Sequence, residues 1–214
     1  MSKTTAPLLS FDARGQIGKS QVYSSWKGRA YARRYVVPSN PKSGEQTKTR
    51  SAFAWLQGVF KVLPAIVKDG WTAYANTSRI TAANAFLKGN LSNLRGETTL
   101  DLMLLSPAAN SGLPAAAATF TPGDDKVTVA LTAATLPAGW AIVEARAAAI
   151  RDQDPQTNAY YTVIAGSDNA APYSIELAGL ASGVKYQCGA WFVYSKPDGS
   201  LAYGEAIMGD ATTT

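Results

Sequence analysis

The first regular pattern of hydrophobic positions in the chain is an alternation with a period of two, between residues 17 and 37. Apolar and polar residues alternate on both sides of the dipeptide Lys27-Gly28, whose composition is typical of a tight turn. A period of two is that of a β-strand, so this stretch predicts a β-hairpin with side chains on two faces. Pro38 and Pro41 end the second strand, because proline has no amide hydrogen to donate to a β-ladder.

The period changes to that of an α-helix after Pro41. Ser43 and Gln46 have the spacing of a capping box, in which each side chain binds an unpaired amide at the start of a helix. Apolar residues then recur at helical intervals and predict a helix over residues 44–63: Phe53, Leu56, Phe60 and Leu63. Two shorter helices are predicted by similar patterns, one from Pro64 through Trp71 and Tyr74 and one from Thr81 to Leu91.

Residues 115–214 contain short alternating segments with turn residues about every ten positions, which is typical of an antiparallel β-sandwich. The expected strands are Val127–Leu131, Trp140–Ile150, Tyr160–Ile164, Tyr173–Leu177, Tyr186–Tyr194 and Leu201–Met208. In the fifth of these, alternation directs four residues to the sandwich core and leaves Trp191 and Val193 on the opposite face. The four are Tyr186, Cys188, Ala190 and Phe192.

These patterns predict an α+β protein in four parts. Residues 1–14 have no hydrophobic period and are expected to form an extended arm that a partner or a neighbouring subunit orders. Residues 15–97 form a hairpin-and-helix module, and residues 115–214 form the sandwich. Residues 98–114 are a linker or a packing strand, since Leu100–Leu105 is too apolar to lie free in water.

The charges are divided unevenly along the chain. Residues 1–97 carry 15 Lys and Arg against 4 Asp and Glu, a net charge of +11, whereas residues 98–214 carry 5 against 11, a net charge of −6. Such an asymmetry predicts that the N-terminal module is a basic docking module aimed at an acidic partner.

Several classes of chemistry are disfavoured by composition. The chain has no histidine and only one cysteine, which excludes Ser-His and Cys-His catalysis and a zinc cluster. The acidic pairs at Asp124-Asp125 and Asp152–Asp154 lie beside Gly or Pro and have turn composition. We therefore expect a protein that is not an enzyme, with no catalytic residues, no metal site and no cofactor. Cys188 is expected to be a small buried hydrophobe.

No apolar run is long enough to span a membrane, and the first residues lack the apolar core of a signal peptide. We accordingly expect synthesis in a cytoplasm and no membrane partner.

The strongest candidate for a binding site is the basic stretch within residues 15–46. Five cations lie between residues 19 and 34 without any acid among them, and aromatic residues are interleaved with them. The candidate partner-binding residues are Lys19, Trp26, Lys27, Arg29, Tyr31, Arg33, Arg34 and Tyr35. The aromatic rings either pack on the helix of residues 44–63 or belong to an exposed ribbon. In the second case the cations contact an acidic protein surface or the phosphates of a nucleic acid.

A family resemblance begins at Leu180. Leu180, Gly183 and Tyr186, followed by an alternating strand, resemble the tyrosine corner of fibronectin type III domains. The resemblance covers about residues 115–210 and implies that the Tyr186 hydroxyl binds nearby backbone. The strand Val127–Thr132 lacks the tryptophan usual in that family, so an immunoglobulin-like relative remains open.

A second resemblance covers residues 15–91. The motifs WKG, YxR, PSNP, W-x-x-Y-A at Trp71–Ala75 and F-x-x-x-N at Phe86–Asn90 occur in an order that resembles a group of tailed-bacteriophage proteins. This resemblance implies a virion structural protein, made in the host cytoplasm. Its partners would be the capsid, neck or tail proteins and copies of itself, with the acidic sandwich projecting or contacting neighbouring subunits.

Two other functions are weighed against this one. The same basic hairpin could bind nucleic acid, although no nucleic-acid-binding fold signature accompanies it. The sandwich could be a carbohydrate-binding adhesion module, with Trp140, Trp191 and Tyr194 as stacking platforms on its surface.

Overall fold

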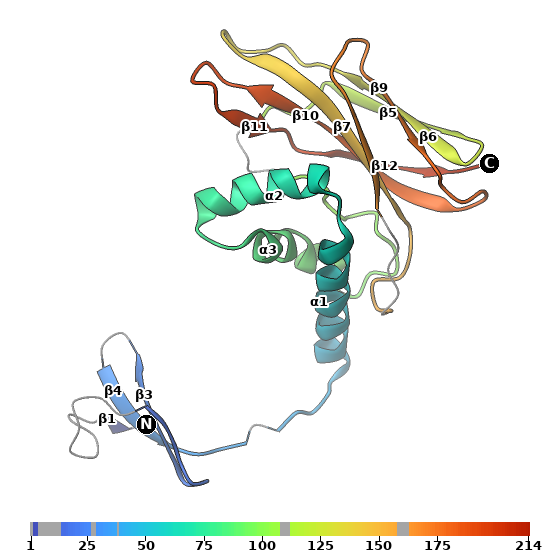
Figure 1. The fold of residues 1–214 in the computed structure, drawn as a ribbon. Coiled ribbons are helices and arrows are strands. Elements are labelled where there is room, and N and C mark those ends of the chain that lie inside the picture. The colour runs from blue at the N-terminus through green and yellow to red at the C-terminus, as the bar shows by residue number, and fades with distance from the viewer. Residues whose placement is uncertain (1, 4–13, 27–28, 38, 108–111, 158–162) are drawn as a thin grey trace. The chain divides into compact units, whose positions relative to one another are not determined.

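The computed structural model describes residues 2–3, 14–26, 29–37, 39–107, 112–157 and 163–214 (Figure 1). The chain divides into two compact units, Met1–Lys42 and Ser43–Thr214. The sequence pattern placed the main boundary near residue 97 instead, between the helices and the sandwich. The boundary differs because the helices share a hydrophobic core with the sandwich, as described below.

The N-terminal unit is a four-stranded antiparallel sheet in the order β1-β4-β3-β2. Its strands are β1 (Ser2–Lys3), β2 (Gly15–Ile17), β3 (Gln21–Trp26) and β4 (Arg29–Arg34). Trp26 pairs with Arg29, which confirms the predicted hairpin, although Lys27 and Gly28 lie outside the described residues. β1 pairs with β4, so the start of the predicted extended arm belongs to this sheet, while residues 4–13 are outside the description.

Three helices open the second unit, which we call the body: α1 (Gly44–Val62), α2 (Ala65–Ser78) and α3 (Ala82–Leu94). The Ser43 hydroxyl accepts a hydrogen bond from the Gln46 amide at 3.4 Å, as the capping box predicted. The Thr81 hydroxyl caps α3 in the same way at 3.2 Å from the Asn84 amide. None of the helices in the described part of the chain is both long and apolar enough to cross a membrane.

The rest of the body is an antiparallel β-sandwich. One sheet has the order β5-β6-β9, with strands at Ala117–Gly123, Lys126–Thr132 and Ser174–Ala178. The other has the order β11-β10-β7-β8 with β12 also paired to β10. Its strands are β7 (Ala141–Arg151), β8 (Ile164–Asp168), β10 (Lys185–Ser195), β11 (Leu201–Tyr203) and β12 (Ile207–Thr212). The predicted α+β class with a fibronectin type III-like or immunoglobulin-like sandwich is confirmed. Residues 158–162 of the expected strand at Tyr160–Ile164 are not described.

The tyrosine corner is present. The Tyr186 hydroxyl accepts a hydrogen bond from the Ala181 amide at 2.8 Å, which is the backbone contact that the resemblance implied. The alternation after Tyr186 is confirmed as well, since Tyr186, Cys188, Ala190 and Phe192 all belong to the cluster between the two sheets.

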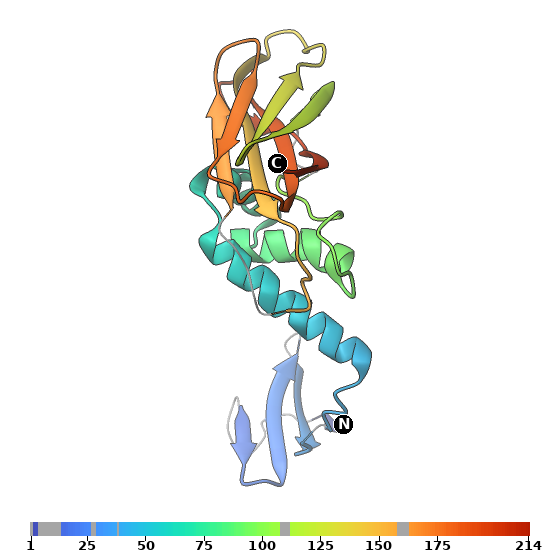
Figure 2. The same ribbon diagram turned by 90° about the vertical axis from the view of Figure 1, so that its right-hand side faces the viewer.

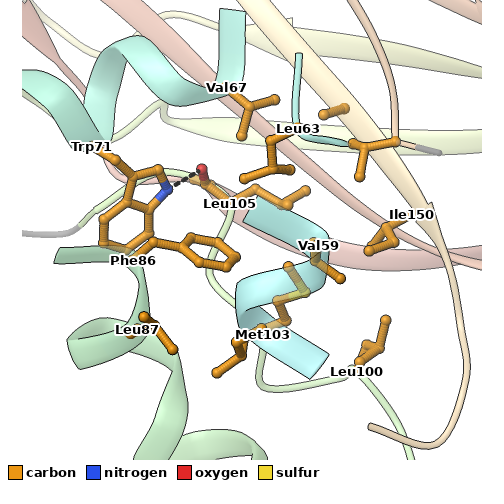
Figure 3. Close-up of a cluster of buried hydrophobic side chains, with 14 of the residues drawn as sticks. Val59, Leu63, Val67, Trp71, Phe86, Leu87, Leu100, Met103, Leu105 and Ile150 are labelled. Atoms are coloured by element: carbon orange, nitrogen blue, oxygen red, sulfur yellow. Dashed lines mark hydrogen bonds between the residues drawn. The ribbon is translucent and has the colours of Figure 1, made fainter. Parts of the chain in front are cut away.

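A second hydrophobic cluster lies on the other face of the five-stranded sheet. The three helices lie along one side of the sandwich (Figure 2). Trp191 and Ile150 pack there with side chains of all three helices, among them Val59, Trp71 and Phe86 (Figure 3). Leu100, Met103 and Leu105 join this cluster from the segment that follows α3, and all three are fully buried. That segment therefore packs as predicted, but it forms turns and no strand.

Arg146 fastens α2 to the same face of the sheet. Its guanidinium donates to the Ile66 carbonyl at 2.7 Å and to the Asp69 carboxylate at 3.1 Å, and it pairs with Glu144 at 2.7 Å. Because Arg146 is only 8% exposed, these contacts satisfy a charge that is otherwise costly to bury.

Candidate partner-binding surface

The strand register distributes the cations of the N-terminal sheet over both of its faces. In β4, Arg29, Tyr31 and Arg33 lie on one face, which we call the Arg29–Arg33 face. Directly opposite residues of antiparallel strands share a face, so Val22, paired with Arg33, lies there as well. Arg34 lies on the other face with its partner Gln21. Arg33 and Arg34 therefore belong to the same strand, as expected, but their side chains lie on opposite faces of the sheet.

The remaining candidate residues have different positions. Lys19 is exposed in the turn between β2 and β3. Tyr35 continues β4 by one pair, since its amide donates to the Ser20 carbonyl at 2.8 Å. Tyr31 and Tyr35 are half-buried. The side chain of Trp26 and the whole of Lys27 lie outside the described residues.

The N-terminal unit is strongly basic and has few acids to neutralise it. Residues 1–42 contain eight Lys and Arg and one acid, Asp12, a net charge of +7. Within the described residues of this unit, Arg29, Arg33 and Arg34 are exposed. The net positive charge of the unit favours an acidic partner.

One hollow of about 270 Å³ opens on this sheet. It is lined by Ser20, Gln21, Ala32, Arg33 and Arg34. Because Arg33 and Arg34 lie on opposite faces, their guanidinium groups do not converge on one anion, and each can form paired hydrogen bonds with a separate carboxylate or phosphate.

The candidate sandwich surface is corrected by the structure. Trp191 is 1% exposed and belongs to the cluster with the helices, and Tyr194 is fully buried between the two sheets. Trp140 is half-buried and its ring contacts that of Tyr194 at 6.0 Å. Trp191 and Tyr194 are therefore interior residues, and no aromatic platform formed by these three residues faces solvent.

The two helical motifs have a structural role. The Trp71 indole donates to the Leu105 carbonyl at 2.9 Å (Figure 3). The Asn90 amide group donates to the Leu104 carbonyl at 3.1 Å and accepts from the Leu104 amide at 2.7 Å. W-x-x-Y-A and F-x-x-x-N thus hold the segment after α3 against the helices. Trp71 also lines an apolar hollow of about 180 Å³ with Tyr74 and Gly89.

Cys188 and Lys185 have well-defined surroundings in the described part of the body. Burial raises the pKa of the Cys188 thiol to about 12, so its nucleophilic thiolate is scarce at neutral pH, and Cys188 is the buried residue that was expected. Lys185 lies among three carboxylates, with Asp101 at 3.2 Å, Asp152 at 3.5 Å and Asp210 at 3.7 Å. In the described part of the chain, no cluster of three or more acidic, histidine or cysteine residues could hold a metal ion.

Comparisons with known proteins give matches to solved structures alone, because no family model and no curated protein matches the chain. A computationally redesigned β-sandwich protein is 14% identical over 48% of this chain and 90% of its own length, with a TM-score of 0.34. The FN3 domain of human collagen XX is 18% identical over 50% of this chain and 98% of its own length, with a TM-score of 0.35. A protein described as a myokine is 12% identical over 51% of this chain and 100% of its own length, with a TM-score of 0.33. The assignment of residues 115–214 to the fibronectin type III-like sandwiches rests on the strand order and the tyrosine corner described above.

Proposed function

We propose that this chain is a non-enzymatic structural protein of a tailed-bacteriophage particle. Its basic N-terminal sheet docks on an acidic protein surface of the capsid, neck or tail. The body projects from that surface or contacts neighbouring subunits, including copies of itself. The chain would be made in the host cytoplasm and reside in the virion.

One observation carries the docking role. The Arg29–Arg33 face presents two exposed guanidinium groups on either side of Tyr31, in a unit with a net charge of +7. Arginine and tyrosine are residue types enriched at protein interfaces, because they combine apolar area with hydrogen-bond donors. The order of motifs in residues 15–91, which resembles that of phage proteins, supports the choice of particle.

Mass spectrometry of purified particles, separated into heads and tails, tests this proposal. The chain is expected in one of the two fractions, and its absence from both contradicts the proposal. An Arg29→Ala/Arg33→Ala double variant should be depleted from that fraction. The matched control, Lys61→Ala/Lys88→Ala, removes two exposed cations from the helices and should be incorporated normally.

Nucleic acid is the second candidate partner, favoured by the position of Tyr31 between Arg29 and Arg33 in β4. Binding to phosphates releases counterions, so it weakens steeply as salt concentration rises. A filter-binding series with double- and single-stranded DNA between 50 and 200 mM salt distinguishes the two partners. Absent or salt-insensitive binding excludes nucleic acid.

A further inference from the structure

The N-terminal sheet has no interior among its described side chains. None of residues 14–25, 29–37 and 39–42 is buried. Apolar side chains of this unit are instead exposed, with exposed fractions of 46% for Ile17, 67% for Val36 and 72% for Val37. In β7 of the body, by contrast, Ala145 and the residues from Ala147 to Ile150 are completely buried.

The described side chains of this sheet therefore lack the burial that is the main force stabilising sheets. Fixing a backbone costs conformational entropy, and the burial of apolar surface is the term that offsets it. Small antiparallel sheets consequently need a hydrophobic face that packs on something else. The described strands of this sheet therefore gain stability from a surface that covers them.

The charge of the sheet restricts what that surface can be. A second copy of the same sheet also carries a net charge of +7 and is repelled. A nucleic acid would neutralise the arginines, but its phosphate backbone would leave Val22 and Tyr31, which lie on the Arg29–Arg33 face, without apolar contacts. A protein surface with carboxylates around an apolar centre satisfies both the arginines and the apolar side chains.

We propose that the N-terminal sheet becomes stably ordered only when an acidic protein surface covers its Arg29–Arg33 face. This inference rests on the proposed docking function and adds that folding of the sheet is coupled to docking. The position of Arg34 on the opposite face makes the inference specific, because one flat partner surface contacts Arg29 and Arg33 together and leaves Arg34 uncovered.

Hydrogen exchange of the full chain, followed by mass spectrometry, tests the inference. In the free protein, amides of residues 21–34 should exchange at least 100-fold faster than those of β7 and β10. An excess of a glutamate–tyrosine copolymer, an acidic polypeptide with apolar rings, should slow exchange in residues 21–34 at least tenfold. The same measurement with oligothymidylate should leave those residues fast.

Three variants identify the face that binds. Arg29→Ala/Arg33→Ala should abolish the slowing by the copolymer, Arg34→Ala should retain it, and Lys61→Ala/Lys88→Ala should match the wild type. Exchange in the free protein as slow as that of β10 overturns the inference, because the sheet is then already covered.

The inference is also overturned if the copolymer does not slow exchange, if oligothymidylate alone does so, or if Arg34→Ala is as damaging as the double variant. Absence of the chain from particles, together with the expected exchange pattern, contradicts the phage function and leaves the coupled ordering intact.

Discussion

Strands β4 and β10 were both predicted from alternating positions but have opposite environments. In β10, nine consecutive residues from Tyr186 to Tyr194 are buried, because the sheet β5-β6-β9 covers one face and the helices cover the other. In β4, both ends are exposed and the middle is half-buried. Alternation therefore predicts a strand, but the burial of that strand depends on the elements that cover each face.

The two units also differ in charge. Residues 43–214 carry twelve Lys and Arg against fourteen Asp and Glu, a net charge of −2, whereas residues 1–42 carry +7. The N-terminal sheet, whose described side chains are not buried, is thus also the unit with the larger net charge. We interpret the body as a self-sufficient fold and the N-terminal sheet as its interface with a partner.

The largest expected effect comes from removing the helices. A chain of residues 115–214 exposes Trp191 and Ile150, and the burial of each such side chain contributes roughly 1.5–3 kcal/mol. The loss of about 5 kcal/mol is comparable to the whole stability of many domains. Circular dichroism and thermal melting should show an unfolded or aggregated fragment, whereas residues 43–214 melt cooperatively. A sandwich fragment as stable as the body would contradict the claim that the helices and the sandwich form one self-sufficient unit.

Arg146→Ala should give the next largest effect. It removes the link between β7 and α2 and leaves Glu144 and Asp69 without their partner. We expect a loss of about 2 kcal/mol in the free energy of unfolding, since both carboxylates remain partly exposed. Lys126→Ala breaks the exposed pair with Glu176 and should cost less than about 1 kcal/mol. Urea denaturation measures both, and equal losses would contradict the role assigned to Arg146.

Tyr186→Phe should destabilise the body by about 1 kcal/mol, because the Ala181 amide loses its hydrogen bond to the hydroxyl while the ring stays packed. Tyr31→Phe in the N-terminal sheet provides the comparison and should not change the melting temperature of the body. A Tyr186→Phe variant that unfolds like the wild type in urea would show that the corner contributes nothing.

The smallest effect concerns pH. Hydrogen bonds from Thr99 and Lys185 hold the pKa of Asp101 below its ordinary value of 3.8. The stability from this carboxylate is therefore present above pH 3.8 and is lost as pH falls through the lowered pKa. The hydrogen bond to Asp101 raises the pKa of Lys185 above 10.5, so its contribution is complete below that pH and is lost above it. In thermal melts, Asp101→Asn should lie slightly below the wild type at pH 7 and converge with it near pH 2.

The sequence predicted local structure well where short-range chemistry determines it. The cap at Ser43, the hairpin pairing of Trp26 with Arg29 and the tyrosine corner at Tyr186 all depend on residues a few positions apart. Such contacts require particular residues at a fixed spacing in the sequence, and this spacing can be recognised without knowledge of the tertiary fold.

The boundary between the units could not be placed in this way, because it depends on contacts between distant segments. Trp191 and Val193 were expected on the face away from the sandwich core, which is correct, but the helices cover that face. The nearly continuous apolar run in β10 was a signal of burial on both faces. For the candidate site, the period of two already separates Arg33 from Arg34 and places Tyr194 on the core face with Phe192, whereas the burial of Trp191 required the packed structure.

Deletion of residues 1–42 tests the central claim most directly. The remaining body should melt within about 2 °C of the full chain, because its two hydrophobic clusters are complete without the N-terminal sheet. The same deletion should remove the chain from purified particles. A deleted chain that melts normally and is still incorporated would contradict the assignment of docking to the N-terminal sheet.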